Sequence, residues 1–222
     1  MKKKEIMSHV DHTLLSPVAS WEEIEKLADE AIEYGAASIC IPQSYVARVK
    51  DKYGDRVNIC TVVGFPLGYN SSSSKLEEVR SALEDGANEI DMVINISHVK
   101  NQDYGKVEEE IKAIREACQD KVLKVIIETC YLTEEEKIQM CKIVSRAGAD
   151  YIKTSTGFGP GGAKMEDILL FKDHLEGGVK IKASGGIRTL EDLIGFIQAG
   201  AERLGSSSAI KILEGDQGRG SY

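Results

Sequence analysis

Three lysines and an aspartate lie inside short runs of strand-like residues, where charged side chains are unusual. Asp91 occurs in EIDMVIN, Lys124 in LKVIIET, Lys153 in DYIKTS and Lys182 in VKIKAS. A lysine amine without its proton can attack a carbonyl carbon and form a Schiff base, and a nearby carboxylate can move protons during that reaction. These residue types indicate covalent chemistry on a carbonyl substrate if the fold brings them together.

The surrounding segments decide whether these residues can meet. Runs of β-branched residues alternate with amphipathic segments rich in Glu, Lys, Ala and Leu, a pattern typical of repeated βα units and a parallel sheet. We expect strands at residues 9–14, 38–42, 58–63, 89–95, 123–129, 150–155, 179–184 and 202–206, and the clearest helices at 21–34, 75–85, 104–118 and 134–147.

The length of the chain favours one closed domain. A chain of 222 residues is the size of one α/β barrel, which uses about 200 to 250 residues. We therefore predict an α/β fold, a single (β/α)8 TIM barrel spanning residues 1–213. Residues 214–222 read EGDQGRGSY, which has no apolar periodicity and three glycines, so we expect a flexible tail there.

Alternate residues of a barrel strand point toward the axis, and the others pack against the helices. In EIDMVIN the apolar Ile90, Met92 and Ile94 suit the helix side, which turns Asp91 and Glu89 inward. The same parity predicts inward positions for Asp11, Thr13, Cys40, Lys124, Glu128, Lys153 and Lys182.

One inward lysine can be explained by an ion pair or by a side chain that extends to solvent. Several buried charges around one axis are costly, and such clusters mark active sites. Ammonium groups on neighbouring strands, roughly 6 Å apart, would lower a lysine pKa by about two units at an effective dielectric of about 20. A nucleophilic amine at neutral pH is the expected result, but parity does not say which lysine supplies it.

Glycine- and serine-rich loops follow the last three predicted strands. They are TSTGFGPGGA at residues 154–163, SGGIR at 184–188 and GSSS at 205–208. Such clusters often form simple turns. At these positions of a barrel, however, backbone N–H groups commonly bind phosphate, so we expect a phosphorylated small-molecule substrate.

Charge and composition exclude several classes of partner. The net charge is −8 and the isoelectric point is near 5.2, which argues against nucleic acid or an anionic membrane as partner. No apolar run approaches a membrane span, and the first residues do not resemble a signal peptide, so a cytoplasmic location is expected. The five cysteines and four histidines show no metal-ligand spacing, and we expect reduced thiols and no metal.

The strings DHTLL, CIP, VVGFP, EIDMVIN, KVIIET, ADYIKTSTGF, VKIKASGGIRT and RLGSSS together resemble the deoxyribose-phosphate aldolases, nearly end to end. The resemblance implies a metal-free and cofactor-free aldolase that reversibly cleaves 2-deoxy-D-ribose 5-phosphate to glyceraldehyde 3-phosphate and acetaldehyde. By position, Lys153 matches the Schiff-base lysine, and Asp91 and Lys182 match the pair that donates and accepts protons.

The same resemblance assigns further residues. Those that fall where the family binds phosphate are Gly157, Gly185, Gly186, Gly205, Ser207 and Ser208, and those that fall near the reacting carbons are Asp11, Thr13, Cys40 and Lys124. The family tends to end in tyrosine, so Tyr222 is a candidate that folds over the mouth and assists enamine protonation, unless it is a terminus without a role.

Alternatives remain at this point. Another Schiff-base aldolase, a phosphosugar isomerase that works by carboxylate acid–base chemistry, and a barrel that only senses a sugar phosphate all fit parts of the pattern. Borohydride would trap a Schiff base but not an isomerase. Helices with apolar outer positions favour a homodimer.

Overall fold

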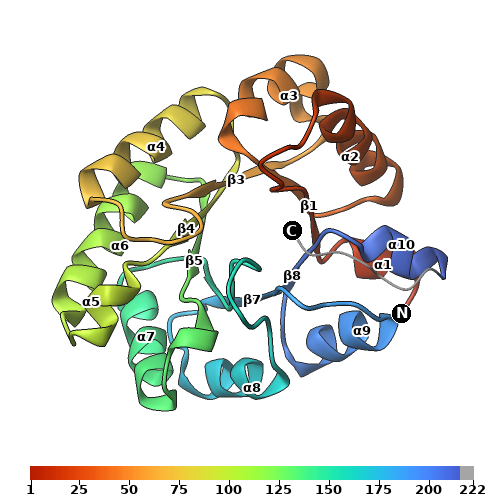
Figure 1. Cartoon of the computed structure of the whole chain (residues 1–222). Coiled ribbons are helices and arrows are strands. Elements are labelled where there is room, and N and C mark those ends of the chain that lie inside the picture. Colours follow the sequence, from red (N-terminus) through yellow and green to blue (C-terminus); the bar gives the residue numbers. More distant parts are fainter. Residues whose placement is uncertain (216–222) are drawn as a thin grey trace.

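The computed structural model describes residues 1–215, and within them eight parallel strands close into a barrel in chain order. Figure 1 looks along the barrel, with the helices forming an outer ring around the strands. The predicted (β/α)8 barrel is confirmed. The strands are β1 Val10–Thr13, β2 Ser38–Ile41, β3 Ile59–Val63, β4 Glu89–Val93, β5 Val122–Ile126, β6 Tyr151–Lys153, β7 Lys180–Ser184 and β8 Arg203–Ser206.

Helices cover the four amphipathic segments named from the sequence, and others lie between them. They are α1 Lys3–Met7, α2 Trp21–Tyr34, α3 Val46–Tyr53, α4 Ser72–Glu84, α5 Ile96–Lys100, α6 Tyr104–Cys118, α7 Glu134–Arg146, α8 Met165–His174, α9 Leu190–Ala199 and α10 Ala209–Glu214, with short 3₁₀ turns η1 Gln43–Tyr45, η2 Gly54–Arg56 and η3 Thr129–Tyr131. Helix α4 begins earlier than expected because the Ser71 side chain accepts a hydrogen bond from the Ser74 N–H and caps it. No helix in residues 1–215 is long and apolar enough to cross a membrane.

Apolar packing lies between the sheet and the helices. Ile90, Met92, Ile152 and Ile181 all belong to one large buried cluster with the inner faces of the helices, as parity predicts. Inside the barrel the described part of the chain forms a small apolar cluster, around Leu15 and the thiols of Cys40 and Cys60. Stability from apolar burial is thus concentrated outside the barrel wall, which leaves the interior to polar groups.

Strand register brings the inward charged residues side by side. Asp91 on β4 pairs with Lys124 on β5, and Lys153 on β6 pairs with Lys182 on β7. Lys182 in turn pairs with Arg203 on β8. Because neighbouring strands lie about 4.8 Å apart, these side chains must meet at the axis.

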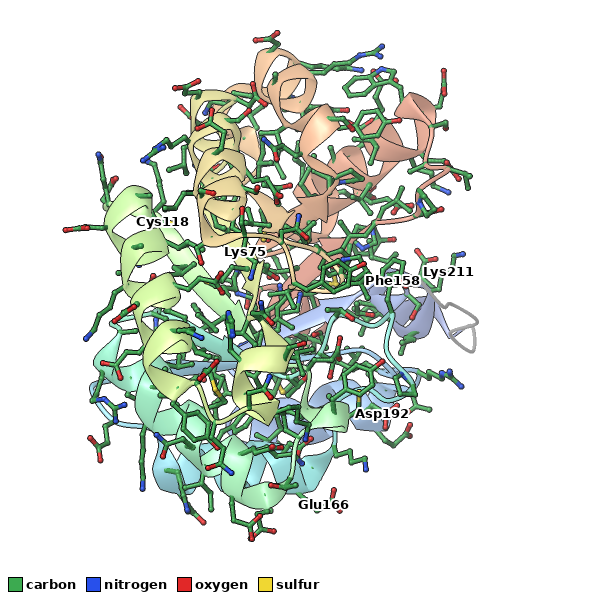
Figure 2. All side chains as sticks on the ribbon, turned by 60° about the vertical axis from the view of Figure 1, so that its left-hand side comes forward. Lys75, Cys118, Phe158, Glu166, Asp192 and Lys211 are labelled. Atoms are coloured by element: carbon green, nitrogen blue, oxygen red, sulfur yellow. The ribbon has the colours of Figure 1, made fainter. Side chains whose placement is uncertain are left out.

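One lysine is buried outside the barrel wall. Lys75 lies on the inner side of α4 (Figure 2), and its Nζ donates hydrogen bonds to Oε2 of Glu110 on α6 at 2.9 Å and to the Val93 carbonyl oxygen at 2.8 Å. Burial lowers the pKa of Lys75, and Glu110 opposes that shift. This ion pair fixes α4 and α6 against the end of β4, two residues beyond Asp91.

Candidate active site

The lysines that sequence parity turned inward meet at Asp91. Nζ of Lys153 lies 2.7 Å and Nζ of Lys182 lies 2.6 Å from the same oxygen, Oδ2 of Asp91. Nζ of Lys124 donates to the other oxygen, Oδ1, at 2.9 Å. All four side chains are buried. The predicted convergence of these residues on one axis is confirmed.

Asp11 supports Lys182 from the opposite side of the barrel. Nζ of Lys182 lies 2.5 Å from Oδ2 of Asp11. Oδ1 of Asp11 accepts hydrogen bonds from Nη1 of Arg203 at 2.5 Å and from Oγ of Ser38 at 2.7 Å. Lys182 is therefore held between two carboxylates.

Glu89 closes the arrangement. Its Oε2 lies 2.5 Å from Nζ of Lys124 and 2.8 Å from Nη1 of Arg203. The contacts form a closed cycle of alternating charge, which we call the charge ring: Asp91, Lys124, Glu89, Arg203, Asp11 and Lys182. Three carboxylates balance three cations in this ring. Lys153 is attached to it through Asp91, its one ion-pair partner within residues 1–215.

Pairing in the ring offsets the cost of burial. Burial raises the pKa of Asp91, but Lys124, Lys153 and Lys182 more than offset this and hold it well below its usual value. Burial lowers the pKa of Lys182, whereas Asp11 and Asp91 raise it further, so that the net direction is upward. The sequence predicts ammonium groups on neighbouring strands that repel one another. The structure corrects this, because each ammonium has a carboxylate within hydrogen-bond distance.

Two thiols complete the floor of the site. Sγ of Cys60 donates to Oδ1 of Asp91 at 3.2 Å and accepts from Nζ of Lys124 at 3.3 Å. A hydrogen bond with Cys60 lowers the pKa of Cys40, although burial opposes that effect. The ligand atoms of Cys40, Cys60 and Asp91 lie within 4.8 Å of one another, close enough for a metal ion. A cation there would compete with Lys124 for Asp91.

The loop after β6 is fixed by Glu128. This buried residue has a left-handed backbone (φ +52°), and its carboxylate accepts hydrogen bonds from the N–H and Oγ1 of Thr156. Burial raises the pKa of Glu128, and the Thr156 hydrogen bonds oppose the rise. The loop after β6 bends toward the barrel axis (Figure 1). The ring of Phe158 in this loop packs edge to face against the ring of Phe65, with 5.3 Å between the ring centres.

Glycines allow the loops after β6 and β7 to touch. A Cβ on Gly162 would lie 2.3 Å from the Gly185 carbonyl oxygen, and one on Gly185 would lie 3.4 Å from Cα of Gly157. Gly157, Gly185 and Gly186 all have positive φ, which favours glycine. The resulting surface of close-packed backbone is suited to an anion that binds N–H groups.

Comparison with known proteins identifies the family. A family model described as DeoC/LacD family aldolase matches residues 6–214. This chain belongs to the DeoC/LacD aldolase family. The aldolase is 63% identical over 220 residues to a deoxyribose-phosphate aldolase of Clostridium botulinum (strain Alaska E43 / Type E3), which covers 99% of this chain and 100% of the relative. It is 54% identical to a deoxyribose-phosphate aldolase of Clostridioides difficile (strain 630), over 96% of this chain and 97% of the relative.

Solved structures give the same family. A putative deoxyribose-phosphate aldolase from Coccidioides immitis superimposes with a TM-score of 0.92 at 42% identity and covers 96% of this chain and 86% of that one. The deoxyribose phosphate aldolase from Aeropyrum pernix, described as tetrameric, has a TM-score of 0.87 at 33% identity and covers 96% of this chain and 91% of that one.

Two further predicted site residues, Thr13 on β1 and Gly205 on β8, lie beside the charge ring. Oγ1 of Thr13 donates to the Asp11 carbonyl oxygen at 2.7 Å, beneath the carboxylate that holds Lys182. A Cβ on Gly205 would lie 2.8 Å from Cβ of Ser184 and 3.3 Å from Cε of Lys182, so the bare backbone leaves room for the lysine.

Ser207 and Ser208 follow β8. Ser208 is the N-cap residue of α10, and its N–H donates to Oγ of Ser206 at 3.2 Å. Ser207 lines a cavity that also includes His12 on β1 and Tyr34 on α2, apart from the glycines of the loops after β6 and β7. Tyr222 and the tail from residue 216 onward lie outside the described residues.

Sequence reasoning missed part of this site. Parity turned Glu89 inward without assigning it a role, and the same parity in ERLGS would have placed Arg203 on the face of Gly205. Cys60 was likewise available from the alternation in NICTVV. None of these patterns reveals that Glu89 and Arg203 meet across the barrel, because the contact joins β4 to β8.

Proposed function

We propose that this aldolase reversibly cleaves 2-deoxy-D-ribose 5-phosphate to D-glyceraldehyde 3-phosphate and acetaldehyde through a Schiff base on Lys153. The observation that carries the proposal is the position of Lys153 relative to the charge ring. Lys182 and Lys124 each contact at least two carboxylates. Lys153 shares a single oxygen of Asp91 with Lys182, so its ammonium form has the fewest partners.

The proposed reaction starts with attack of the Lys153 amine on C1 of the open-chain sugar. Asp91 and Lys182 move protons as the carbinolamine loses water and becomes an iminium ion. Removal of the proton from the C3 hydroxyl breaks the C2–C3 bond and releases glyceraldehyde 3-phosphate, while the electron pair enters the iminium to give an enamine. Protonation of the enamine at C2 and addition of water then release acetaldehyde and restore the amine.

The loops after β6, β7 and β8 are assigned to the phosphate group. Gly157, Gly185 and Gly186 are supported by their adjacent backbones, which can direct N–H groups toward an anion. Gly205, Ser207 and Ser208 are carried over from the family motif RLGSSS. Asp11, Thr13, Cys40 and Lys124 are proposed to line the pocket near the reacting carbons, and no metal or organic cofactor takes part in the proposed steps.

Two further assignments complete the proposal. The five free thiols are compatible with a reducing, cytoplasmic compartment. A homodimer is supported by exposed apolar side chains such as Leu169 on α8 and Leu190 on α9. Light scattering after size-exclusion chromatography would measure the mass in solution, and a monomer or a tetramer would contradict the dimer.

The decisive experiment is borohydride reduction in the presence of acetaldehyde, followed by mass spectrometry of the digested protein. We expect the reduced adduct on Lys153. An adduct on Lys124 or Lys182 would overturn the assignment, and no adduct would favour an isomerase or a sugar-phosphate sensor. A coupled assay for glyceraldehyde 3-phosphate should show cleavage of deoxyribose 5-phosphate by the wild type and none by Lys153→Ala.

A further inference from the structure

We propose that Glu89 and Arg203 act as an opposed pair of positioning charges that set the pH at which this aldolase forms its Schiff base. The inference rests on the function proposed above and deepens it. Both residues belong to the charge ring, and each is the first residue of its strand. They are in contact with each other, and neither is hydrogen-bonded to Lys153.

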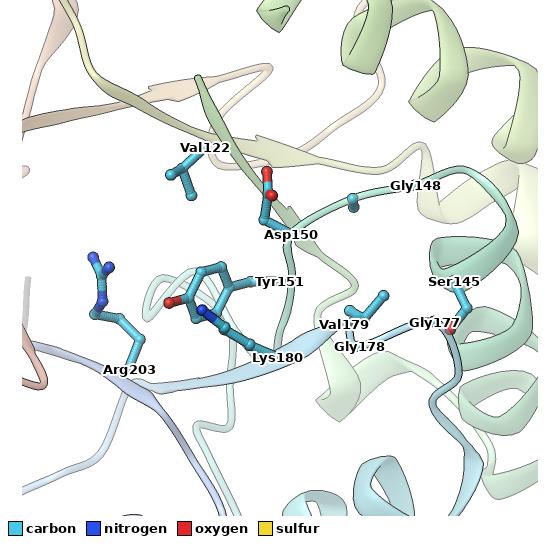
Figure 3. Close-up of a pocket in the computed structure, with 11 residues that line it drawn as sticks. Val122, Ser145, Gly148, Asp150, Tyr151, Gly177, Gly178, Val179, Lys180 and Arg203 are labelled. Carbon is cyan, nitrogen blue, oxygen red and sulfur yellow. The ribbon is translucent and has the colours of Figure 1, made fainter. Parts of the chain in front are cut away.

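The two residues lie away from the loops assigned to the substrate. Figure 3 shows Arg203 beside Tyr151 and Lys180 at the amino ends of the strands, where these residues line a cavity of about 420 Å³. The guanidinium carbon of Arg203 lies 5.3 Å from the centre of the Tyr151 ring. The loops after β6 and β7 leave the opposite, carboxyl ends of their strands. Glu89 and Arg203 therefore act through the ring and not by touching the substrate.

Titratable and charged groups surround Lys153 in the barrel interior. They come from every strand: Asp11 (β1), Cys40 (β2), Cys60 (β3), Glu89 and Asp91 (β4), Lys124 (β5) with Glu128 after it, Tyr151 (β6), Lys180 and Lys182 (β7) and Arg203 (β8). Most of these are bonded directly to a lysine or to Asp91. In the ring, Glu89 lies one contact beyond Lys124, and Arg203 lies one contact beyond Asp11.

The charge balance fixes the sign of each substitution. Glu89→Gln removes one negative charge, leaves the ring with a surplus positive charge and disfavours a further ammonium on Lys153. Arg203→Met removes one positive charge, leaves the ring negative and favours that ammonium. The free amine therefore appears at lower pH in the first variant and at higher pH in the second. We expect each substitution to shift the pH midpoint by about half to one unit, for a charge at this distance from Lys153 and an effective dielectric of about 20.

The test measures the rate of borohydride trapping with acetaldehyde as a function of pH. Its midpoint belongs to the coupled cluster rather than to one side chain, which makes it the appropriate readout. Wild type, Glu89→Gln, Arg203→Met and the double variant are compared, with the exposed Glu84→Gln as matched control. We expect midpoints below and above that of the wild type for the single variants. The double variant restores the charge balance and should return to the wild-type midpoint, as should Glu84→Gln.

A role in folding alone predicts a different result. It would lower activity in both single variants without moving their midpoints in opposite directions, and that outcome overturns the inference. Circular dichroism at each pH identifies a variant that does not fold. If Arg203→Met does not fold, Arg203→Lys takes its place; it keeps the charge and must keep the wild-type midpoint. The downward shift of the midpoint in Glu89→Gln then tests the inference. No trapped adduct in the wild type at any pH would overturn the proposed function, and with it this inference, whereas an adduct without opposed shifts overturns the inference alone.

Discussion

Lys153 and Lys182 donate hydrogen bonds to one and the same oxygen, Oδ2 of Asp91, at 2.7 and 2.6 Å. The shared oxygen connects the proposed nucleophile to the lysine that is proposed to move protons with Asp91. A proton can thus pass between these groups with little movement of heavy atoms. The two lysines are also adjacent in strand register, so the barrel itself fixes the arrangement.

Removal of the Asp91 charge should damage catalysis. Asp91→Asn keeps the shape of the side chain but leaves three lysines without their common carboxylate. We expect kcat/KM for deoxyribose 5-phosphate to fall by about 100-fold or more, the scale of general acid–base catalysis. The coupled assay measures this, with the exposed Asp51→Asn as control. An Asp91→Asn variant as active as Asp51→Asn would rule out the proposed role.

The buried Lys75–Glu110 pair should control stability. Lys75→Met removes the cation beside the buried Glu110 carboxylate and leaves it the Ser72 hydroxyl, which costs about 3–5 kcal/mol of unfolding free energy. Lys75→Met/Glu110→Leu removes both charges and should recover most of that loss. Urea unfolding measures both values. Lys112→Met breaks an exposed pair with Glu108 and should cost about 1 kcal/mol or less. Equal losses for the Lys75 and Lys112 variants would contradict the argument.

The raised pKa of Glu128 predicts a pH dependence of stability. Because the pKa of Glu128 in the folded chain lies above its ordinary value of 4.5, the folded chain keeps this proton at pH values where the unfolded chain has released it. Glu128 therefore makes folding less favourable as the pH rises through that range. Glu128→Gln should remove this effect, so the unfolding free energy of the variant relative to wild type should rise from pH 5 to pH 7. The lowered pKa values of Asp11 and Asp91 act at lower pH.

Urea unfolding at the two pH values tests the Glu128 prediction. The exposed Glu109→Gln serves as the matched variant, and its difference from wild type should not change with pH. A Glu128→Gln variant whose difference from wild type is equally constant would show that the buried carboxyl does not hold its proton in the folded state.

The contact between the loops after β6 and β7 should control phosphate affinity. Gly162→Ala places a methyl group 2.3 Å from the Gly185 carbonyl oxygen and must push the loops apart. We expect KM for deoxyribose 5-phosphate to rise at least about tenfold, with a smaller effect on unphosphorylated deoxyribose. Gly105→Ala on α6 has open space around the new methyl group and should leave both values unchanged. Equal effects on the KM of the two substrates would show that these loops do not bind the phosphate group.

Sequence alone predicts the features that follow local periods. The alternation of EIDMVIN and VKIKAS places Asp91 and Lys182 inside the barrel, since a strand repeats every two residues. The partners of these side chains depend on barrel closure, which brings Glu89 to Arg203 from strands far apart in the chain. Lys75 escapes prediction because a lysine in an amphipathic helix normally faces solvent. The left-handed backbone of Glu128 likewise has no local signal.

The apolar layer of this barrel is separate from its charged interior. Ile90 and Met92 face the helices while their neighbours Glu89 and Asp91 face the axis. Consequently each strand of the wall serves two purposes at once: its outward side chains hold the scaffold together, and its inward side chains carry the groups assigned to the reaction.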